Sequence, residues 1–302
     1  MKKLLLLLLC LCLTAPALAD KNTYELPIDF SGGYIPLESN FTDTTYEDES
    51  LSVRMEKRDI DGVRYDIAWI KAASPTQLRT AVAGEPNESK SELASRMSRD
   101  KNAVVAINGE YYIQRTEEAL VYRQGIAFRY LDPQNTRKDV LVIDEAGDLH
   151  VFLGGDSQVQ ELVDFLQSGH KIINGFSFGP AIVKNGEALP LPERYRVRED
   201  GRDSGLFDSA VRAPRMVIAQ VGPLEYVFVE AEGRNDVSKG VTTDDMGKFM
   251  ASLGVQTAYC LDGGNTCVMM FHRKYYDSNY RDSERELSDI VYVCTAVPDG
   301  GM

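Results

Sequence analysis

Residues 215–234 read RMVIAQVGPLEYVFVEAEGR, two apolar runs separated by Gly222-Pro223-Leu224 and followed by a polar segment that ends in Gly233-Arg234. Apolar runs rich in β-branched and aromatic residues and bounded by turn residues are typical of strands. A short connection between two such runs predicts an antiparallel hairpin. This hairpin, with the strands Arg215–Val221 and Glu225–Ala231, is the element from which we build the predicted sheet.

Other segments show the same strand signals. Val63–Trp69 alternates apolar and polar residues with a period of two, which predicts a half-buried strand. Further strands are predicted at Lys101–Ile107, Val121–Tyr130, Asp139–Ile143, Leu149–Leu153, Thr257–Leu261 and Asp289–Ala296. Strands outnumber helices, so the sheet dominates the predicted fold.

Three helices are predicted beside these strands. Val159–Leu166 follows the 3.6-residue period, with Asp156 or Ser157 as the N-cap. Met246–Leu253 does the same, and Thr242 stands three residues before Asp245, which is the spacing of a capping box. A weaker helix covers Ser91–Arg99. No repeat or linker divides the chain, so we predict one α+β domain on a mixed, largely antiparallel sheet flanked by a few helices.

The first nineteen residues are predicted to be a signal peptide. Lys2-Lys3 precede the apolar run Leu4–Leu13, and Ala17-Leu18-Ala19 is a small-x-small cleavage site. The run is too short to span a bilayer, so we expect an exported protein, periplasmic or secreted, without stable membrane insertion. Residues 20–50 are predicted to form an irregular N-terminal arm or an edge segment, and residues 51–302 the domain.

Composition narrows the possible functions. The chain has 302 residues, 43% apolar and 26% charged, which suits one large or two small globular domains and excludes disordered, collagenous and coiled-coil proteins. Its net charge of −13 would repel a nucleic-acid backbone or an anionic membrane, so no nucleic-acid partner is expected. Any phosphate ligand must therefore meet local arginines.

Three thiols follow the signal segment, at Cys260, Cys267 and Cys294. A Cys260–Cys267 disulfide and three buried free cysteines are equally compatible with this pattern. The three histidines are not paired at metal-ligand spacing, and no Cys-x-x-Cys, P-loop or dinucleotide motif occurs. We expect no cofactor, although scattered carboxylates leave a structural calcium ion open.

Four segments place glycines and polar residues at the ends of apolar strands. They are Asn108-Gly109-Glu110, residues 174–180 (NGFSFGP), residues 230–234 (EAEGR) and residues 261–267 (LDGGNTC). The first and the last also read as turns, because Asn-Gly and Asp-Gly are common hairpin turns. The arginine of the third, Arg234, also reads as a surface ion pair. Each also suits a ligand site, because glycines allow backbone to approach a ligand closely.

Two single-residue alternatives bear on these segments. Ser177 lies in a Gly-x-Ser-x-Gly pattern and precedes Asp262 and His272 in the order of an α/β-hydrolase triad. Pro180 and a second turn follow instead of the helix that this pattern requires, which disfavours a serine esterase. Asp245 is an acid in the same region, but its spacing from Thr242 favours a capping role.

Taken in order, these segments resemble the phosphodiester glycosidase family, in its exported bacterial branch. The resemblance covers about Tyr46 to Ala296. Its most specific part is Gly233-Arg234, Ser238-Lys239-Gly240, the capped helix and Leu261-Asp262-Gly263-Gly264. Ala106–Gly109, Phe178–Pro180 and Arg285–Asp289 support it. The family usually continues Asp-Gly-Gly with Gly-Ser, whereas this chain has Asn265-Thr266, which leaves a hydroxyl available.

The resemblance implies hydrolysis of a sugar-1-phosphodiester at its glycosidic bond, with a phosphorylated glycan as the substrate. Glycoside hydrolysis usually uses two carboxylates, and Asp262 and Glu110 are the candidates. Candidate substrate-binding residues are Asn108, Ser177, Gly179, Arg234, Gly263, Gly264, Thr266 and Arg285. Two alternatives stay open: a non-catalytic glycan-binding protein that uses the same residues, and a phosphodiesterase that cuts the P–O bond. Protein partners are unknown.

Overall fold

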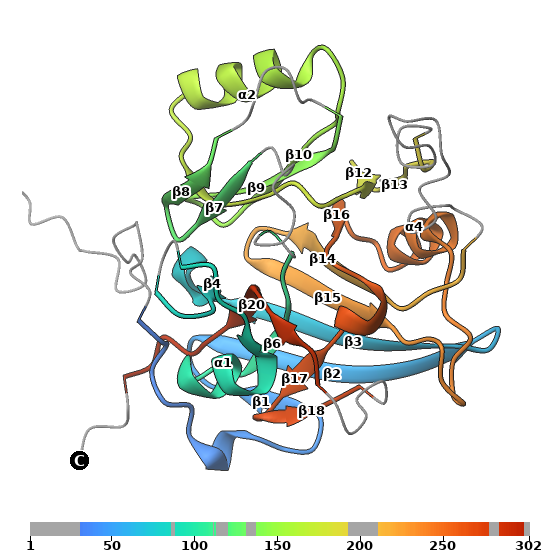
Figure 1. Cartoon of the computed structure of the whole chain (residues 1–302). Helices are drawn as coiled ribbons and strands as arrows, with labels where there is room; N and C mark the ends of the chain where they lie inside the picture. Colours follow the sequence, from blue (N-terminus) through green and yellow to red (C-terminus); the bar gives the residue numbers. More distant parts are fainter. Residues whose placement is uncertain are drawn as a thin grey trace, which may run out of the picture.

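The structure, a computed structural model, describes residues 31–85, 88–110, 112, 120–130, 137–192, 211–277 and 284–298. The predicted signal peptide lies outside the described residues, as does the start of the predicted arm. Within the described part the fold is α+β, as predicted, and every strand pair runs antiparallel. Figure 1 shows the sheets with a few helices around them.

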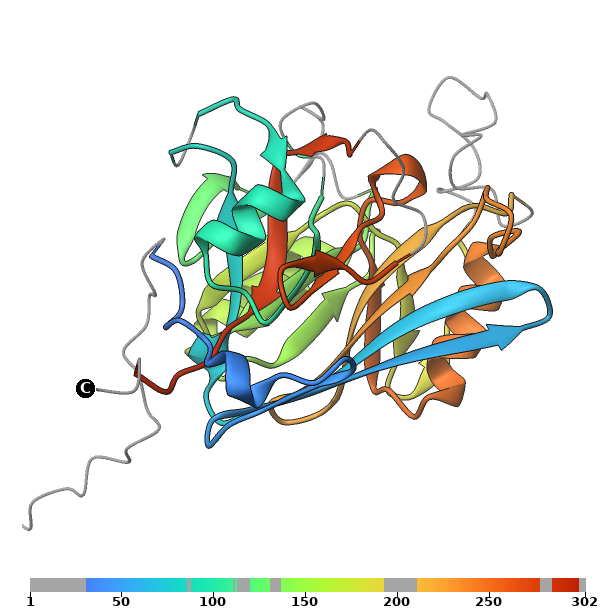
Figure 2. The ribbon, with the colours of Figure 1, turned by 90° about the horizontal axis from the view of Figure 1, so that it is seen from below.

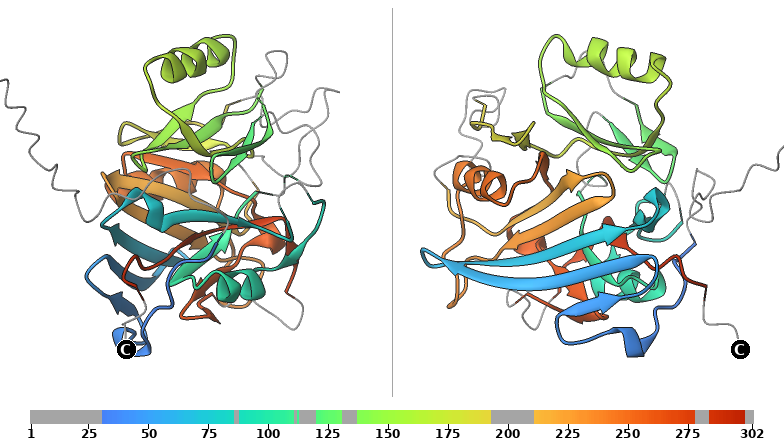
Figure 3. Two further views of the ribbon diagram at one scale, coloured as in Figure 1. Left: turned by 90° about the vertical axis from the view of Figure 1, so that its left-hand side faces the viewer. Right: turned by 180° about the vertical axis from the view of Figure 1, so that it is seen from behind.

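The largest sheet has eight strands. Their order is β1 (Thr45–Glu47), β2 (Leu51–Ile60), β3 (Val63–Ala72), β15 (Glu225–Ala231), β14 (Arg215–Gly222), β16 (Thr257–Cys260), β12 (Ala181–Lys184) and β13 (Glu187–Ala188). The predicted hairpin is β14–β15, in register from Arg215 opposite Ala231 to Gly222 opposite Glu225. Figure 3 shows β15 beside β3 and β2 in this sheet. The long β2–β3 hairpin runs along one side of the molecule (Figure 2).

Two five-stranded sheets complete the core, with a short pair beside them. One has the order β10 (Leu149–Phe152), β9 (Val140–Asp144), β11 (Ile172–Phe176), β7 (Val121–Arg123) and β8 (Ile126–Arg129). The other has the order β18 (Lys274–Tyr275), β17 (Met269–Phe271), β6 (Val105–Asn108), β20 (Asp289–Val293) and β4 (Leu78–Val82). The pair consists of β19 (Glu286–Leu287) and β5 (Glu92–Leu93).

The helices cover outer faces of the sheets. These are α1 (Ala94–Asp100), α2 (Gln158–Gln167) and α4 (Thr243–Ser252), with 3-10 turns η1 (Glu38–Asn40), η2 (Pro75–Gln77) and η3 (Gly264–Thr266). Met246 and Met250 of α4 pack on the large sheet, and Leu162 of α2 packs on β9, β10 and β11. Among the described residues, no helix has the length and apolar character needed to cross a membrane.

The main core lies between the large sheet and the two smaller ones. Alternate residues of the central strands face it, including Phe228 of β15, Ile218 of β14 and Ala68 of β3. Their neighbours face α4 on the other side. Because both faces are covered, the central strands are apolar on both sides, which is why they read as nearly continuous apolar runs.

Two local features differ from the sequence-based prediction. Val121–Tyr130 was expected to be one strand, but it forms the β7–β8 hairpin because Gln124 and Gly125 adopt positive φ angles of 51° and 79°. The predicted arm includes the edge strand β1, where Tyr46 is 1% exposed and packs its ring on Phe41. Residues 45–47 therefore belong to the large sheet as its edge strand, and the buried ring of Tyr46 holds them there.

Candidate functional site

The predicted segments meet where β6 and β16 end. The Asn108 side chain donates from Nδ2 to the Asp262 carbonyl at 2.8 Å and accepts at Oδ1 from the Val268 amide at 3.2 Å. The Asp262 amide in turn donates to the Gly109 carbonyl at 3.2 Å. Asn108 is completely buried, whereas Asp262 is 9% exposed. The Asn108 amide thus fixes the loop that carries the Asp262 carboxylate.

Arginines converge on the glycine loop after Asp262. Gly264 has a φ of 67°, and a Cβ there would lie 3.5 Å from Nη1 of Arg234. A Cβ at Gly263 would lie 2.9 Å from the Pro214 carbonyl, closer than a real Cβ approaches backbone. The close approach at Gly263 and the positive φ at Gly264 favour glycine at both positions, and the Arg234 guanidinium lies against this bare backbone.

Two further arginines adjoin the same loop. Arg285 donates to the Thr266 hydroxyl at 3.1 Å, and Thr266 is buried. Arg215 lies under Gly263, where burial and the nearby charge of Arg234 lower the pKa of its guanidinium. A guanidinium remains charged in proteins. Arg215, Arg234 and Arg285 therefore bring three guanidinium charges to one loop of an acidic chain.

Glu110 lies deeper in the structure than the other predicted catalytic residue. Its Oε1 accepts from Nη2 of Arg123 at 2.9 Å, and its Oε2 accepts from the amides of Ser177 and Phe178 at 2.8 and 3.0 Å. It is only 2% exposed. Both oxygens are thus used within the protein, and Glu110 joins the end of β6 to the end of β11.

Arg123, which sequence reasoning did not identify, connects this carboxylate to another. Its Nε donates to Asp289 Oδ2 at 2.9 Å, and its Nη1 donates to the carbonyls of Tyr122 and Gly175. Arg123 is completely buried, and Asp289 is 1% exposed. Burial raises the pKa of Asp289 to about 6, against the opposing charge of Arg123.

Ser177 and Gly179 follow β11 on the inner side of this network. The Ser177 hydroxyl donates to the Leu120 carbonyl at 3.0 Å and is completely buried. His272 lies elsewhere and bonds Glu38 at 2.6 Å. The described residues thus do not bring the serine and histidine of an esterase triad together. Gly179 has a φ of 69° at the Gly179–Pro180 bond.

A second group of acids crosses the large sheet nearby. Lys57, Asp66 and Glu230 are consecutive cross-strand partners on β2, β3 and β15. Lys57 donates to Asp66 Oδ1 at 2.5 Å, and both carboxylates are completely buried. Burial, with Glu232 adding to it, raises the pKa of Asp66 to about 8. Raised pKa values of this kind cluster at functional sites.

The Cys267 thiol connects the two groups. Burial raises its pKa well above the usual range, and the charges of Glu230, Asp262 and Asp277 act in the same direction. These carboxylates must lie within electrostatic reach of one sulfur atom. Cys260, Cys267 and Cys294 are all free and buried, so the structure contains the three thiols and not the disulfide alternative.

Thr242 is the N-cap of α4, and Asp245 takes part through its backbone amide. Its amide donates to the Thr242 hydroxyl at 3.1 Å in the first turn of α4. Its carboxylate is half exposed and lies 3.8 Å from Arg212.

The signal that could have found Asp289 and Glu230 was present in the sequence, because both are acids at the end of an apolar strand. Arg123 gave no such signal.

Comparison with known proteins identifies the family. The sequence model of the phosphodiester glycosidases matches residues 101–294. An uncharacterized SPbeta prophage-derived protein of Bacillus subtilis, YomE, is 26% identical over 204 residues. That alignment covers 67% of this chain and 29% of YomE, so the chain spans less than a third of that relative.

Solved structures share the fold. The zebrafish N-acetylglucosamine-1-phosphodiester α-N-acetylglucosaminidase catalytic domain, auto-inhibited by its pro-peptide, superposes with a TM-score of 0.62, at 15% identity and 87% coverage of each chain. A hypothetical protein from Synechocystis gives a TM-score of 0.51, at 14% identity, covering 81% of this chain and 62% of that one. With a family match over most of the structured chain and this shared architecture, the protein belongs to the phosphodiester glycosidase family.

Proposed function

We propose that this protein is an exported hydrolase that cleaves the glycosidic bond of a sugar-1-phosphodiester in cell-surface or extracellular glycans. The products are a free sugar and a phosphomonoester. The observation that carries the proposal is the Asp262-Gly263-Gly264 loop, where the guanidinium of Arg234 lies against the backbone of Gly264, two residues after the Asp262 carboxylate. The signal-peptide pattern at residues 1–19 supports export.

The arginines suit the anionic half of the substrate. Guanidinium groups bind phosphate through paired, charge-assisted hydrogen bonds. Arg234 and Arg285 are the exposed cations of the loop, and buried Arg215 strengthens the field behind them. These groups stabilise the charge that develops on the departing phosphate. They also explain how a chain of net charge −13 binds an anion.

Asp262 is the carboxylate that we assign to the sugar. It is the more exposed of the two predicted catalytic residues, and it stabilises or attacks the oxocarbenium-like carbon. A phosphomonoester, with a second pKa of about 6, leaves more readily than a sugar alcohol. Protonation of the leaving oxygen is therefore less important here than in hydrolysis between two sugars.

Glu110 serves a different role in this proposal. Its oxygens bond Arg123 and two backbone amides, so neither is available to transfer a proton without breaking those bonds. We assign it as a positioning residue that keeps the ends of β6 and β11 together. Asn108 and Ser177 act in the same way through their buried hydrogen bonds, and Thr266 orients Arg285.

The test is hydrolysis of a panel of sugar-1-phosphodiesters in water enriched in ¹⁸O. The wild type should release sugar that carries the label, and Asp262→Asn should lower kcat by about 10²-fold or more. Asp245→Asn, an exposed acid outside the loop, is the matched control and should keep full activity. Arg234→Lys should weaken substrate use because an ammonium cannot reproduce the guanidinium fork.

The other outcomes separate the alternatives. Label in the phosphate would mean P–O cleavage and would make the protein a phosphodiesterase. Binding without turnover in both wild type and Asp262→Asn would indicate a glycan-binding protein. Full activity of Asp262→Asn with label in the sugar would refute the role given to this carboxylate.

A further inference from the structure

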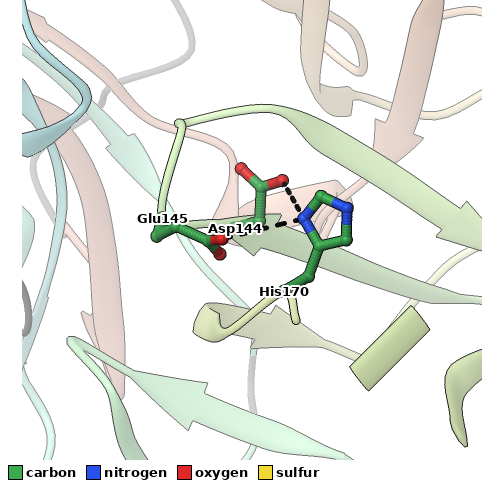
Figure 4. Close-up of side chains that lie close together, drawn as sticks. All are labelled: Asp144, Glu145 and His170. Carbon is green, nitrogen blue, oxygen red and sulfur yellow. Dashed lines mark ion pairs between the residues drawn. The ribbon is translucent and has the colours of Figure 1, made fainter. Parts of the chain in front are cut away.

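A group of metal-ligating side chains lies outside the site described above, at the end of β9. Asp144, Glu145 and His170 place one ligand atom each within 4.8 Å of one another. His170 Nδ1 is 3.2 Å from Asp144 Oδ2 and 3.8 Å from Glu145 Oε1. Figure 4 shows the imidazole directed toward the two carboxylates.

We propose that these three residues form a site for a divalent transition metal of the Zn²⁺ type. Zinc binds imidazole nitrogen and carboxylate oxygen at about 2.0–2.2 Å. Two ligands of a tetrahedral ion at those distances are roughly 3.3–3.5 Å apart. The His170–Asp144 separation of 3.2 Å and the His170–Glu145 separation of 3.8 Å are close to that value, and all three ligand atoms lie within 4.8 Å of one another.

Each carboxylate is already oriented by backbone through one oxygen. Asp144 Oδ1 accepts from the amides of Ala146 and Asp148, both at 2.9 Å, and Oδ2, which also bonds His150, faces the His170 imidazole. Glu145 Oε2 accepts from the Lys171 amide at 2.7 Å and leaves Oε1 toward the same ring. Outer hydrogen bonds of this kind orient ligands in metal sites.

The imidazole has an unsatisfied atom on the same side. The His170 side chain is 41% exposed, but its Nδ1 atom is buried and forms no hydrogen bond among the described residues, and the polar atoms that face it are the carboxylate oxygens of Asp144 and Glu145. The ring stacks on Phe165, with centroids 4.4 Å apart and planes inclined by 4°, so its orientation is fixed. A buried nitrogen without a hydrogen bond is costly, and a metal ion would satisfy it.

His150 is a positioning residue in this arrangement. Its Nε2 bonds Asp144 Oδ2 at 2.9 Å, and its ring also contacts Phe165, at 4.8 Å between centroids. Three protein ligands leave room for water on the metal. The imidazole distinguishes the site from one for calcium or magnesium, which prefer oxygen ligands.

The matched control is the third histidine of the chain. His272 also bonds a carboxylate, Glu38, at 2.6 Å and stacks on a phenylalanine, Phe41, at 3.9 Å. Within the described residues it belongs to no group of three metal-ligating side chains. His272→Asn therefore removes one imidazole–carboxylate pair without touching the proposed site.

The experiment is titration of the metal-free, full chain with ZnCl₂ by calorimetry, and with CoCl₂ by visible absorption. We expect one Zn²⁺ per chain, with binding lost in His170→Asn and weakened at least tenfold in Glu145→Gln. His150→Gln should weaken affinity by about 10–100-fold, and His272→Asn should bind as the wild type does. CaCl₂ should not compete.

Three outcomes of the zinc titration would overturn the proposed metal site. No Zn²⁺ binding by the wild type would overturn the proposal. Equal binding by wild type and folded Glu145→Gln, or an equal loss in His272→Asn, would also overturn it. Glu145 is partly exposed and bonds backbone through the oxygen that glutamine retains, so this variant should fold. The readouts are independent of glycosidase activity.

Discussion

Replacement of Arg123 by methionine should destabilise the protein more than any surface charge change. The guanidinium lies between Glu110 and Asp289, 2.9 and 2.8 Å from their oxygens, and all three side chains are at most 1% exposed. It also donates to two carbonyls, at 2.7 and 2.6 Å, and lies 4.2 Å from the Phe176 ring centroid. Methionine preserves much of the volume and removes the charge.

The expected loss of folding stability in Arg123→Met comes from the two carboxylates that remain buried without their partner. Removing one partner of a buried ion pair costs about 3–5 kcal/mol, because the other charge is left uncompensated. Here two carboxylates and two carbonyls lose their donor at once, so the loss should reach the upper part of that range. A domain of this size has a free energy of unfolding of about 5–15 kcal/mol, so the variant should be marginal.

Arg96 provides the matched control, because it also lies between two carboxylates. It is 3.3 Å from Glu92 and 3.9 Å from Asp100 on α1, but its side chain is 60% exposed. Exposed pairs contribute about 0–1 kcal/mol. Urea unfolding followed by circular dichroism should therefore give Arg96→Met a midpoint near that of the wild type, far above the midpoint of Arg123→Met.

Charge removal from the carboxylates gives an independent check. Adding Glu110→Gln and Asp289→Asn to Arg123→Met should recover part of the lost stability, since no uncompensated charge then remains buried. If Arg123→Met and Arg96→Met had the same midpoint, the importance of the buried ion pair would be refuted. If the triple variant were less stable than Arg123→Met, uncompensated buried charge would not be the cause of the lost stability.

Three other perturbations have expected outcomes. The pKa of Asp66 is about 8 in the folded protein and near 4 in the unfolded chain. Its contribution to the free energy of unfolding is therefore full below about pH 4 and is lost as the pH rises toward 8. Asp66→Asn should reduce this pH dependence in urea unfolding. Gly109→Ala would place a Cβ 2.3 Å from Asp289 Oδ2, so it should cost about 1–3 kcal/mol and lower hydrolytic activity. Thr242→Ala removes the oxygen that accepts from the Asp245 amide and should cost about 1 kcal/mol in thermal unfolding.

Each of these has a control in the same chain. Asp59→Asn changes an exposed acid and should leave the pH dependence between pH 4 and 8 unaltered. Gly222→Ala meets no atom closer than 3.9 Å and should be nearly neutral. Ser252→Ala alters the last turn of α4 and not its cap. If a control variant changed stability or its pH dependence as much as the variant it is paired with, the explanation given for that variant would be contradicted.

Local patterns predicted the three helices and half of the strands. The β14–β15 hairpin and α4 were predicted within a few residues, because apolar periodicity and caps act over short range. Strands β2 and β11 were not predicted. β2 carries many charges, and Gly175 interrupts β11, so neither segment shows a simple strand pattern. Their pairing with β3 and β9 decides their conformation.

The candidate site shows the same division. The segments at Asn108 and Asp262 were identified because glycines and acids at strand ends are visible in the sequence. Their hydrogen bond joins residues 154 positions apart, and the Arg123–Asp289 bond joins residues 166 positions apart. The sequence suggested that Glu110 is catalytic, whereas the structure shows both of its oxygens bonded to groups from distant segments.

The sequence alone determined the fold class, the hairpin, the capped helix and the family resemblance, because these depend on periodicity and on the order of short motifs. Only the tertiary structure decided which charges are buried together. It placed His170 beside Asp144, although the two are not at any recognisable ligand spacing. The physical reason is that burial and pairing depend on through-space distances across sheets, which no local pattern of residues specifies.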